Sequence, residues 1–380
     1  MSSSSGSVEN LRQPHARICE DARENRLHGD ATQDEREVVT PSTRPPGHFE
    51  RSPTEESTLK LGRANLDEFA ETLLGLAQKD SDILVLTSDS RGSAKLTRFG
   101  QTLPDQIIEV GIAEQNLVGV AAGLASTGKK VFAVLPACFL TARALEQIKN
   151  DVAYSDEPVK LVGISAGVSY GALGSTHHSL HDLAALRAIP NIDIMVPADN
   201  FETHKTILAA AHHTRPTYIR FGKRPMYNLH PADTPFEIGK AITLFSGADL
   251  TFVATGETVY SACLAHEELE KQGVASGVIS MHTIKPLDTD TLLQAARQTR
   301  ALVTVEEHSV HGGLGEACAA ALMEAGISLP FHIVGIPDEY TVTGSQLEIF
   351  EHYGISTRGL AATARQLLRD KRIPCPTYLR

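Results

Sequence analysis

Residues 107–126 read IIEVGIAEQNLVGVAAGLAS, and their pattern is the clearest indication of the fold. A β-branched run ends at Gly111, a tight turn follows, and the residues from Glu114 onward have the apolar spacing of a helix. A strand that passes through a turn into a helix is the repeating unit of open α/β sheets. Such sheets bind ligands at the carboxyl edge of their strands, where Glu114 is expected to stand.

Glu114 is the only acidic residue among residues 110–125. A carboxylate that faces a protein core is costly unless it is paired, hydrogen-bonded or protonated. A functional role would explain its position at the ligand-binding edge. A structural role would explain it too, because Glu in the first turn complements the helix dipole. The pattern alone leaves both interpretations open.

Strand-like and helix-like patterns alternate through most of the chain and fall into two groups. The segment 225–237 between them carries three prolines and no periodicity, which is typical of a linker. We therefore predict two α/β domains, 58–224 and 238–374, each with a parallel or mostly parallel sheet flanked by helices. Residues 1–57 are rich in Ser, Pro and charged residues, so we expect a disordered tail there.

The composition excludes several function classes. A net charge of −11 without a basic stripe argues against nucleic acid as a partner. No apolar run reaches the roughly 18–20 residues of a membrane span, and the first residues lack the profile of a secretory signal. Five widely spaced cysteines without a CxxC pair favour reduced thiols. We expect a cytoplasmic protein with no membrane partner.

The stretch GALGSTHHSLHDLAALR, residues 171–187, predicts a Gly-rich loop that runs into a helix carrying His177, His178, His181 and Asp182. His177 and His181 have the i, i+4 spacing that could bind zinc. One of the histidines could instead move protons or bind substrate, or all of them could be surface residues. No third zinc ligand and no HExxH motif is evident, so we expect no resident metal in this chain.

A third stretch, VEEHSVHGGLGEA, places a glycine cluster at residues 312–315 between a strand and a helix. A lone turn of this kind is a weak indication of nucleotide binding, and we interpret it as a turn for close packing. The motifs GxxxxGK[ST] and GxSxG are absent, which argues against phosphate-loop NTPases and serine hydrolases.

Five stretches, in order and spacing, resemble the transketolase and deoxyxylulose-phosphate synthase superfamily: GIAEQNLVGVAAGLA, FLTARALEQIKNDVAY, GSTHHSLHDLAALRAIPNIDIMVPAD, YIRFGKR and VEEHSVHGGLGEA. The resemblance covers about residues 60–372 and implies the pyrimidine-binding and C-terminal domains of these thiamine-diphosphate enzymes. It implies that Glu114 hydrogen-bonds a pyrimidine nitrogen of the cofactor and drives the tautomer that activates it. Phe139 would pack on the aminopyrimidine, and Ile112 would be a further cofactor contact.

The same resemblance implies the substrate contacts. His177, with His178 beside it, would touch the oxygens of the substrate and move protons. Arg143 and Arg220 would bind a sugar phosphate through their planar guanidinium groups.

The chain departs from the family pattern in the substrate loop and near Phe139. Leu173 stands where an Asp that contacts a sugar hydroxyl is expected, and His178 replaces a Gln. Pro136 stands where an aromatic residue is often found. These departures leave the identity of the sugar substrate open.

Full-length family members hold Mg²⁺ and the cofactor diphosphate with a GDG motif in a preceding domain. The only Gly-Asp pair here is Gly29-Asp30, which Ala31 follows. The resemblance is therefore to the C-terminal subunit of a split transketolase. It implies a separate N-terminal-like subunit that mainly holds the Mg²⁺ and the diphosphate, and an α2β2 heterotetramer.

The expected reaction transfers a two-carbon ketol unit from a ketose-like sugar or sugar phosphate to an acceptor. One alternative is transfer of a two-carbon or acyl unit to a carrier-protein or lipoyl thiol, as in 2-oxoacid dehydrogenases. A second is a non-catalytic scaffold of the same fold, since fold does not fix function. The weakest is a metal-dependent hydrolase that uses His177 and His181.

Overall fold

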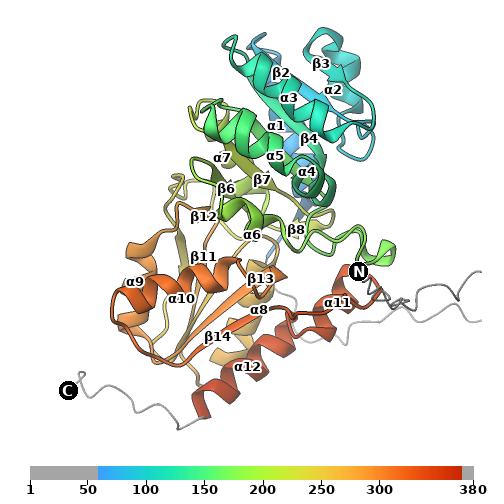
Figure 1. The fold of residues 1–380 in the computed structure, drawn as a ribbon. Coiled ribbons are helices and arrows are strands. Elements are labelled where there is room, and N and C mark those ends of the chain that lie inside the picture. Colours follow the sequence, from blue (N-terminus) through green and yellow to red (C-terminus); the bar gives the residue numbers. More distant parts are fainter. Residues whose placement is uncertain (1–58, 370–380) are drawn as a thin grey trace, which may run out of the picture. The chain divides into compact units, whose positions relative to one another are not determined.

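The computed structural model describes residues 59–369, and its two larger sheets confirm the predicted α/β class with mostly parallel strands. Figure 1 shows helices packed along both sheets. The predicted tail, 1–57, and the last five residues of the predicted second domain lie outside the described residues. So do Cys19 and Cys375, while the three cysteines within them are free thiols.

The first large sheet has seven strands in the order β12-β6-β7-β5-β4-β2-β3, of which only the pair β12 and β6 is antiparallel. Its strands are β2 (Ile83–Thr87), β3 (Ile107–Glu109), β4 (Lys130–Pro136), β5 (Lys160–Ile164), β6 (Asp193–Met195), β7 (Thr217–Arg220) and β12 (Thr283–Lys285). Its α-helices are α1 (Asn65–Ala77), α2 (Thr97–Thr102), α3 (Glu114–Ala125), α4 (Ala137–Arg143), α5 (Leu145–Gln147), α6 (Asp182–Arg187) and α7 (Asn200–Ala210). A π-helical segment, Ile148–Tyr154, follows α5.

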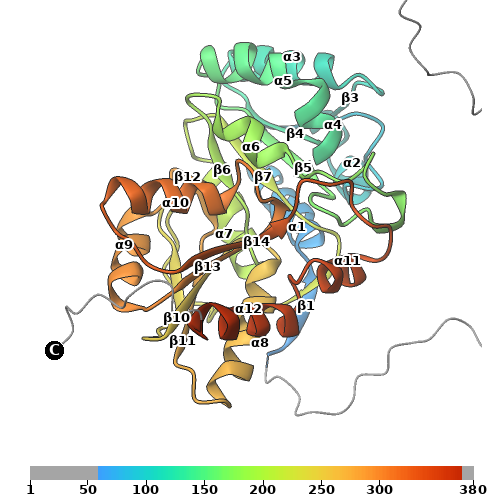
Figure 2. The same ribbon diagram turned by 60° about the horizontal axis from the view of Figure 1, so that its bottom comes forward.

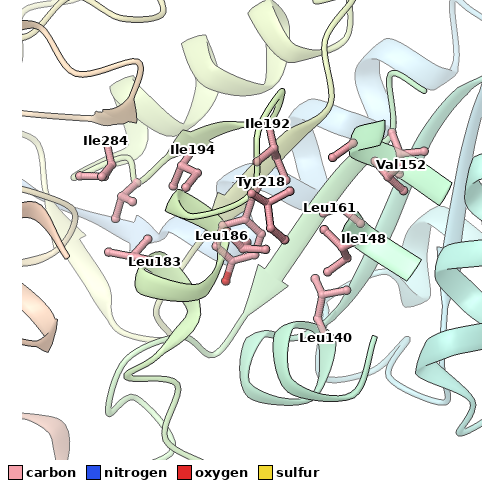
Figure 3. Close-up of a cluster of buried hydrophobic side chains, with 14 of the residues drawn as sticks. Leu140, Ile148, Val152, Leu161, Leu183, Leu186, Ile192, Ile194, Tyr218 and Ile284 are labelled. Atoms are coloured by element: carbon pink, nitrogen blue, oxygen red, sulfur yellow. The ribbon is translucent and has the colours of Figure 1, made fainter. Parts of the chain in front are cut away.

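Strand β4 explains why these strands read as continuous apolar runs. Val131 and Leu135 belong to the core on one face of the sheet, and Phe132 and Val134 belong to the core on the other. Successive side chains point to opposite faces, so a strand covered on both sides needs no polar positions. Figure 3 shows part of the first core, in which Leu140, Leu161, Leu183, Leu186 and Tyr218 come together from helices and strands.

The second large sheet has five strands in the order β14-β13-β10-β11-β9, with only β9 antiparallel to its neighbour. Its strands are β9 (Ile242–Phe245), β10 (Leu250–Ala254), β11 (Ser276–Ser280), β13 (Leu302–Ser309) and β14 (Phe331–Ile336). The accompanying helices are α8 (Thr258–Glu270), α9 (Thr289–Gln298), α10 (Leu314–Glu324), α11 (Gln346–His352) and α12 (Thr357–Arg369). Helix α12 lies against α8 (Figure 2). Within residues 59–369, no helix is long and apolar enough to cross a membrane.

The predicted linker, 225–237, contains one short strand. This strand, β8 (Pro225–Tyr227), pairs antiparallel with β1 (Leu61–Ala64). Proline is compatible with such a two-stranded ribbon because it needs no ladder hydrogen bond at the strand end.

A buried charged cluster joins the segment after β8 to helix α7 of the first large sheet and to strand β11 of the second. His230 Nδ1 lies 3.1 Å from Asp199 Oδ2, and its Nε2 lies 3.2 Å from Glu202 Oε1. Glu202 also accepts a hydrogen bond of 2.6 Å from Ser280 in β11. Although burial acts to lower it, hydrogen bonds to Asp199 and Glu202 raise the pKa of His230 to about 10. His230 is therefore a protonated group held between two carboxylates.

Candidate active site

Glu114 is the first residue of α3, and only 7% of its surface is exposed. Strand β3 ends at Glu109, two residues earlier than predicted, and Gly111 makes the turn with a φ of +73°. Glu114 Oε1 accepts a hydrogen bond of 2.6 Å from Nη1 of Arg143. The buried carboxylate is therefore ion-paired, and it stands at the predicted edge of the sheet.

Arg143 joins Glu114 to Phe139. It is the last residue of α4, which begins immediately after Pro136, the final residue of β4. Its guanidinium carbon lies 4.3 Å from the centre of the Phe139 ring, and 49% of its side chain is exposed. Glu114 and Phe139 thus accommodate a flat group that donates an N–H to the carboxylate while it covers the aromatic ring.

His177 extends this cluster on the side of Phe139. Its ring centre lies 5.4 Å from that of Phe139 and 5.5 Å from that of Tyr170, both in edge-to-face geometry. The exposed Lys223 places its Nζ 4.6 Å from the centre of the Tyr170 ring. The structure therefore brings four predicted residues into one continuous cluster: Glu114, Arg143, Phe139 and His177.

Sequence reasoning missed Tyr170 and Lys223. Lys223 lies in the quoted YIRFGKR stretch, but the argument from bidentate guanidinium geometry directed attention to Arg220. The aromatic contact of Tyr170 depends on the path of a loop, which no local pattern reports.

The predicted helix boundary in the histidine stretch was wrong. Helix α6 begins at Asp182, so His177 and His178 precede it and His181 is its N-cap residue. His181 Nε2 lies 3.3 Å from the Thr141 hydroxyl. Among residues 59–369 no group of three or more His, Cys, Asp or Glu side chains is arranged to hold a metal ion, so the zinc interpretation gains no third ligand.

Both ring nitrogens of His178 have hydrogen-bond partners inside the protein. It is 4% exposed, its Nδ1 lies 2.6 Å from the Thr341 hydroxyl, and its Nε2 lies 3.0 Å from the carbonyl oxygen of Gly171. Burial lowers its pKa. Both nitrogens are engaged inside the protein, so the predicted substrate contact of His178 has no support in this geometry.

Arg220 also lies apart from the cluster, because tertiary packing buries it to 4% exposure. Its Nη1 donates to Asp182 Oδ1 at 3.1 Å, and its Nη2 donates to the carbonyl oxygen of Glu307 at 3.0 Å. Tyr218 donates to the same Asp182 carboxylate at 2.7 Å. The guanidinium is committed to internal partners, so the predicted sugar-phosphate contact of Arg220 has no support in this geometry either.

A further group of buried acids lies beside Arg220. Gln346 Nε2 donates to Glu257 Oε2 at 3.0 Å and to Glu307 Oε1 at 2.7 Å. Burial, and then the charge of Glu257, raise the pKa of Glu307 to about 8. The cavity that Arg220, Glu257 and Glu307 help to line has a volume of about 20 Å³, room for about one water molecule. We interpret this cluster as a structural joint.

The third stretch is the predicted close-packing turn. Glu306 accepts backbone hydrogen bonds from Leu314 at 2.7 Å and from Gly315 at 2.8 Å, at the start of α10. A side chain at Gly313 would collide with the Glu306 carboxylate. The glycine cluster therefore lets the helix start against a buried acid.

Two apolar side chains are exposed in the loops that carry the cluster. Ile112, two residues before Glu114, is 74% exposed, and Leu173, in the loop before His177, is 54% exposed. Both side chains therefore lie at the surface of the chain next to the cluster.

Comparisons with known proteins identify the family of the chain. The chain matches the family described as transketolase, pyrimidine binding domain, over residues 64–227, and the one described as transketolase, C-terminal domain, over residues 239–360. It is 47% identical to an apulose-4-phosphate transketolase subunit of Phocaeicola vulgatus, over 79% of this chain and 96% of that one.

Two further relatives agree. A 6-deoxy-6-sulfo-D-fructose transketolase subunit of Clostridium sp. strain MSTE9 is 36% identical over 80% of this chain and 94% of that one. A solved structure described as a split gene transketolase, inactive beta4 tetramer, superimposes with a TM-score of 0.74 at 38% identity, over 81% of this chain and 99% of that one. These matches cover nearly the full length of each relative and confirm the resemblance seen in the sequence. The chain belongs to the transketolase family, as a beta-type subunit of a split transketolase.

Proposed function

We propose that this chain supplies the pyrimidine-binding half of a thiamine-diphosphate site and, with a partner subunit, transfers a two-carbon ketol unit from an anionic ketose to an acceptor. The observation that carries the proposal is the continuous cluster of Glu114, Arg143, Phe139 and His177. It combines a buried carboxylate, an aromatic face and a half-buried histidine at one edge of an α/β sheet, where ligands bind.

The cluster fits an aminopyrimidine. Arg143 presents a planar, nitrogen-rich group to the Glu114 carboxylate and to the Phe139 ring. An aminopyrimidine is also planar and rich in nitrogen, so it satisfies the same two partners. We assign Glu114 and Phe139 to the cofactor and keep Ile112 as a further contact. The Mg²⁺ ion and the diphosphate are assigned to the partner subunit.

When bound, thiamine diphosphate supplies the nucleophilic carbon that breaks and forms the bond beside the donor carbonyl. Glu114 would hold the pyrimidine ring through a hydrogen bond and favour its reactive tautomer, and Phe139 would fix the plane of the ring. His177 holds a substrate oxygen and moves a proton to or from it. Burial raises the pKa of the nearby Cys138 thiol to about 11, so that thiol stays protonated and does not compete as a nucleophile.

Two accessible cations suit an anionic substrate. Arg143 is half exposed and lies over the Phe139 ring. Lys223 is exposed and lies over the Tyr170 ring. His177 contacts both of these rings, so it lies between the two cations in the series of contacts. We propose these two in place of the buried Arg220 for the anionic end of the sugar. The names of the two curated relatives support this class, because one gives a sugar phosphate and the other a sulfo sugar.

The partner is proposed to be a transketolase N-terminal-like subunit in an α2β2 assembly. The relative of known structure is described as inactive when four beta chains assemble alone. A symmetric assembly of both kinds of subunit is the usual closed solution.

The test is reconstitution with a candidate transketolase N-terminal-like subunit. Ketol transfer from a ketose phosphate or sulfo ketose to an aldose is expected only in the mixture, with thiamine diphosphate and Mg²⁺ present. Glu114→Gln should lower turnover by at least about 100-fold with the assembly intact. Glu146→Gln, a change at an exposed acidic residue, is the matched control and should leave turnover unchanged. Near-normal turnover of Glu114→Gln would refute the assigned role, and transfer to a lipoyl thiol alone would favour the carrier alternative.

A further inference from the structure

The loop that carries His177 is held by a residue from the C-terminal domain. We define the substrate loop as residues 171–178. The Thr341 hydroxyl, in the segment between β14 and α11, lies 3.0 Å from the Ser175 hydroxyl and 2.6 Å from His178 Nδ1. Thr341 is 8% exposed, so these contacts are shielded from water. The two contacts bracket His177 on both sides along the chain.

The direction of each hydrogen bond follows from the partners. The carbonyl oxygen of Gly171 only accepts, so His178 Nε2, 3.0 Å away, carries the proton. Burial lowers the pKa of His178, which keeps the imidazole neutral and leaves Nδ1 as an acceptor. Thr341 must then donate its only hydroxyl proton to His178, and Ser175 must donate to Thr341. Ser175, Thr341, His178 and Gly171 thus form one directed chain that closes the substrate loop.

A second, independent contact joins the same two segments. Gly171 has a φ of +50°, and a side chain there would lie 2.7 Å from the carbonyl oxygen of Gly344. The backbones of the substrate loop and of the segment around residue 344 therefore approach closely, which a larger residue would prevent.

The segment that carries Thr341 has its own support. The Tyr353 hydroxyl accepts the N–H of Val342 at 3.2 Å and donates to Glu339 at 2.9 Å, so it holds the chain on both sides of Thr341. A capping box between Ser345 and Glu348 then fixes the start of α11. Thr341 therefore lies in a segment that has hydrogen bonds of its own on both sides, and it can position the substrate loop.

We propose that Thr341 is a positioning residue: through Ser175 and His178 it fixes the substrate loop so that His177 meets the sugar. The C-terminal domain, which holds no residue of the cofactor cluster, thereby takes part in substrate recognition. The role of His177 in this inference rests on the proposed function. The effect of Thr341 on the order of the loop does not rest on it.

The first measurement uses the isolated chain. Amide hydrogen exchange of residues 171–178 should become at least about tenfold faster in Thr341→Val, because the buried His178 Nδ1 loses its donor. Thr341→Ser restores the hydroxyl and should restore protection. Thr214→Val, at an exposed threonine outside both segments, is the matched control and should exchange like the wild type. Ser175→Ala removes one donor only and should show a smaller change in the same direction, which keeps the test open if Thr341→Val does not fold.

The second measurement uses the enzyme assembled with its partner. Thr341→Val should lower kcat/KM for the ketose about tenfold, with thiamine diphosphate affinity unchanged, and Thr341→Ser should recover most of the loss. Joint loss of cofactor affinity, or unchanged loop exchange in both Thr341→Val and Ser175→Ala, would overturn the proposal. If the wild-type assembly shows no ketol transfer but Thr341→Val still exchanges faster in the loop, the result would support the role of Thr341 in holding the loop. It would count only against the proposed function.

Discussion

Arg143→Met is expected to tighten the binding of thiamine diphosphate to the assembled enzyme. Arg143 contacts both groups that are assigned to the aminopyrimidine, the Glu114 carboxylate and the Phe139 ring. The cofactor must displace the guanidinium before it reaches them. Methionine keeps most of the apolar stem and removes the charged group that competes.

The size of the effect follows from the exposure of the pair. The Arg143 side chain is 49% exposed and the Glu114 side chain 9%, so solvent screens the ion pair from one side. Such a pair contributes up to about 1 kcal/mol, and a cation over an aromatic ring at an exposed site adds about 0.5–1 kcal/mol. Loss of both contacts costs about 0.5–2 kcal/mol, which corresponds to a dissociation constant roughly 2- to 30-fold lower in the variant.

Calorimetric titration of thiamine diphosphate with Mg²⁺ into the complex, without sugar present, measures this change. The matched control is Arg98→Met, which removes a surface pair of the same kind, 2.8 Å from Glu71 and 69% exposed on the arginine side. Cofactor affinity should not change in the control. An Arg143→Met enzyme that binds the cofactor with wild-type or weaker affinity would refute the idea that Arg143 and the aminopyrimidine compete for the same partners.

Three further predictions concern the buried framework. Arg220→Met should lower the free energy of unfolding by roughly 3–5 kcal/mol, because it leaves a buried carboxylate without its cation; a near-zero change in urea unfolding would contradict a structural role. The pKa of His230, which burial acts to lower, is raised to about 10 by its two carboxylate partners, so its imidazolium stabilises the folded chain fully below pH 6.5 and this contribution is lost as the pH rises from 6.5 to 10. Unfolding free energies across that range should show the loss, with a flatter profile for His230→Gln. Gly167→Ala should cost roughly 2–5 kcal/mol, because φ is +61° and the new side chain meets Glu307, whereas Gly128→Ala, with φ of +88° and open space, should cost about 1–2 kcal/mol; equal melting temperatures for the two variants would be inconsistent with this reasoning.

The elements were predictable because their patterns are local. The spacing of apolar residues predicted a helix from Glu114 onward, and α3 runs over Glu114–Ala125. The end of β3 was less predictable. The turn at Gly111, which has a positive φ, takes up the residues between the end of β3 and Glu114. An apolar run in the sequence does not indicate at which residue the hydrogen bonds between the strands end.

The role of Arg220 was not predictable from its neighbours in the sequence. Its partners Asp182 and Glu307 lie 38 and 87 residues away, and they come from a helix and from the other large sheet. A motif identifies the residue type that could bind a phosphate, but tertiary packing decides whether the guanidinium reaches solvent. Arg143, at the exposed end of α4, has that access.

The departure at His178 has a physical explanation. A neutral imidazole offers one donor and one acceptor, and here they serve Gly171 and Thr341. The amide of glutamine, the residue expected from the family pattern, also offers a donor and an acceptor. The hydrogen-bonding pattern that closes the substrate loop is therefore compatible with either residue. Leu173 differs from His178 in this respect. It is exposed, and it cannot form the hydrogen bonds of the Asp expected at this position from the family pattern.

The exposure of Ile112 connects the chemistry to assembly. Chemistry at a carbanion requires a site from which water is excluded, yet this apolar side chain, two residues from Glu114, is 74% exposed in the single chain. Burial of the exposed Ile112 side chain contributes about 1–2 kcal/mol. This burial therefore favours the binding of the cofactor and of the partner surface that close the proposed site. On the proposed function, a cluster that is open on this side would bind its portion of the cofactor more weakly in the isolated chain than in the complex with the second subunit.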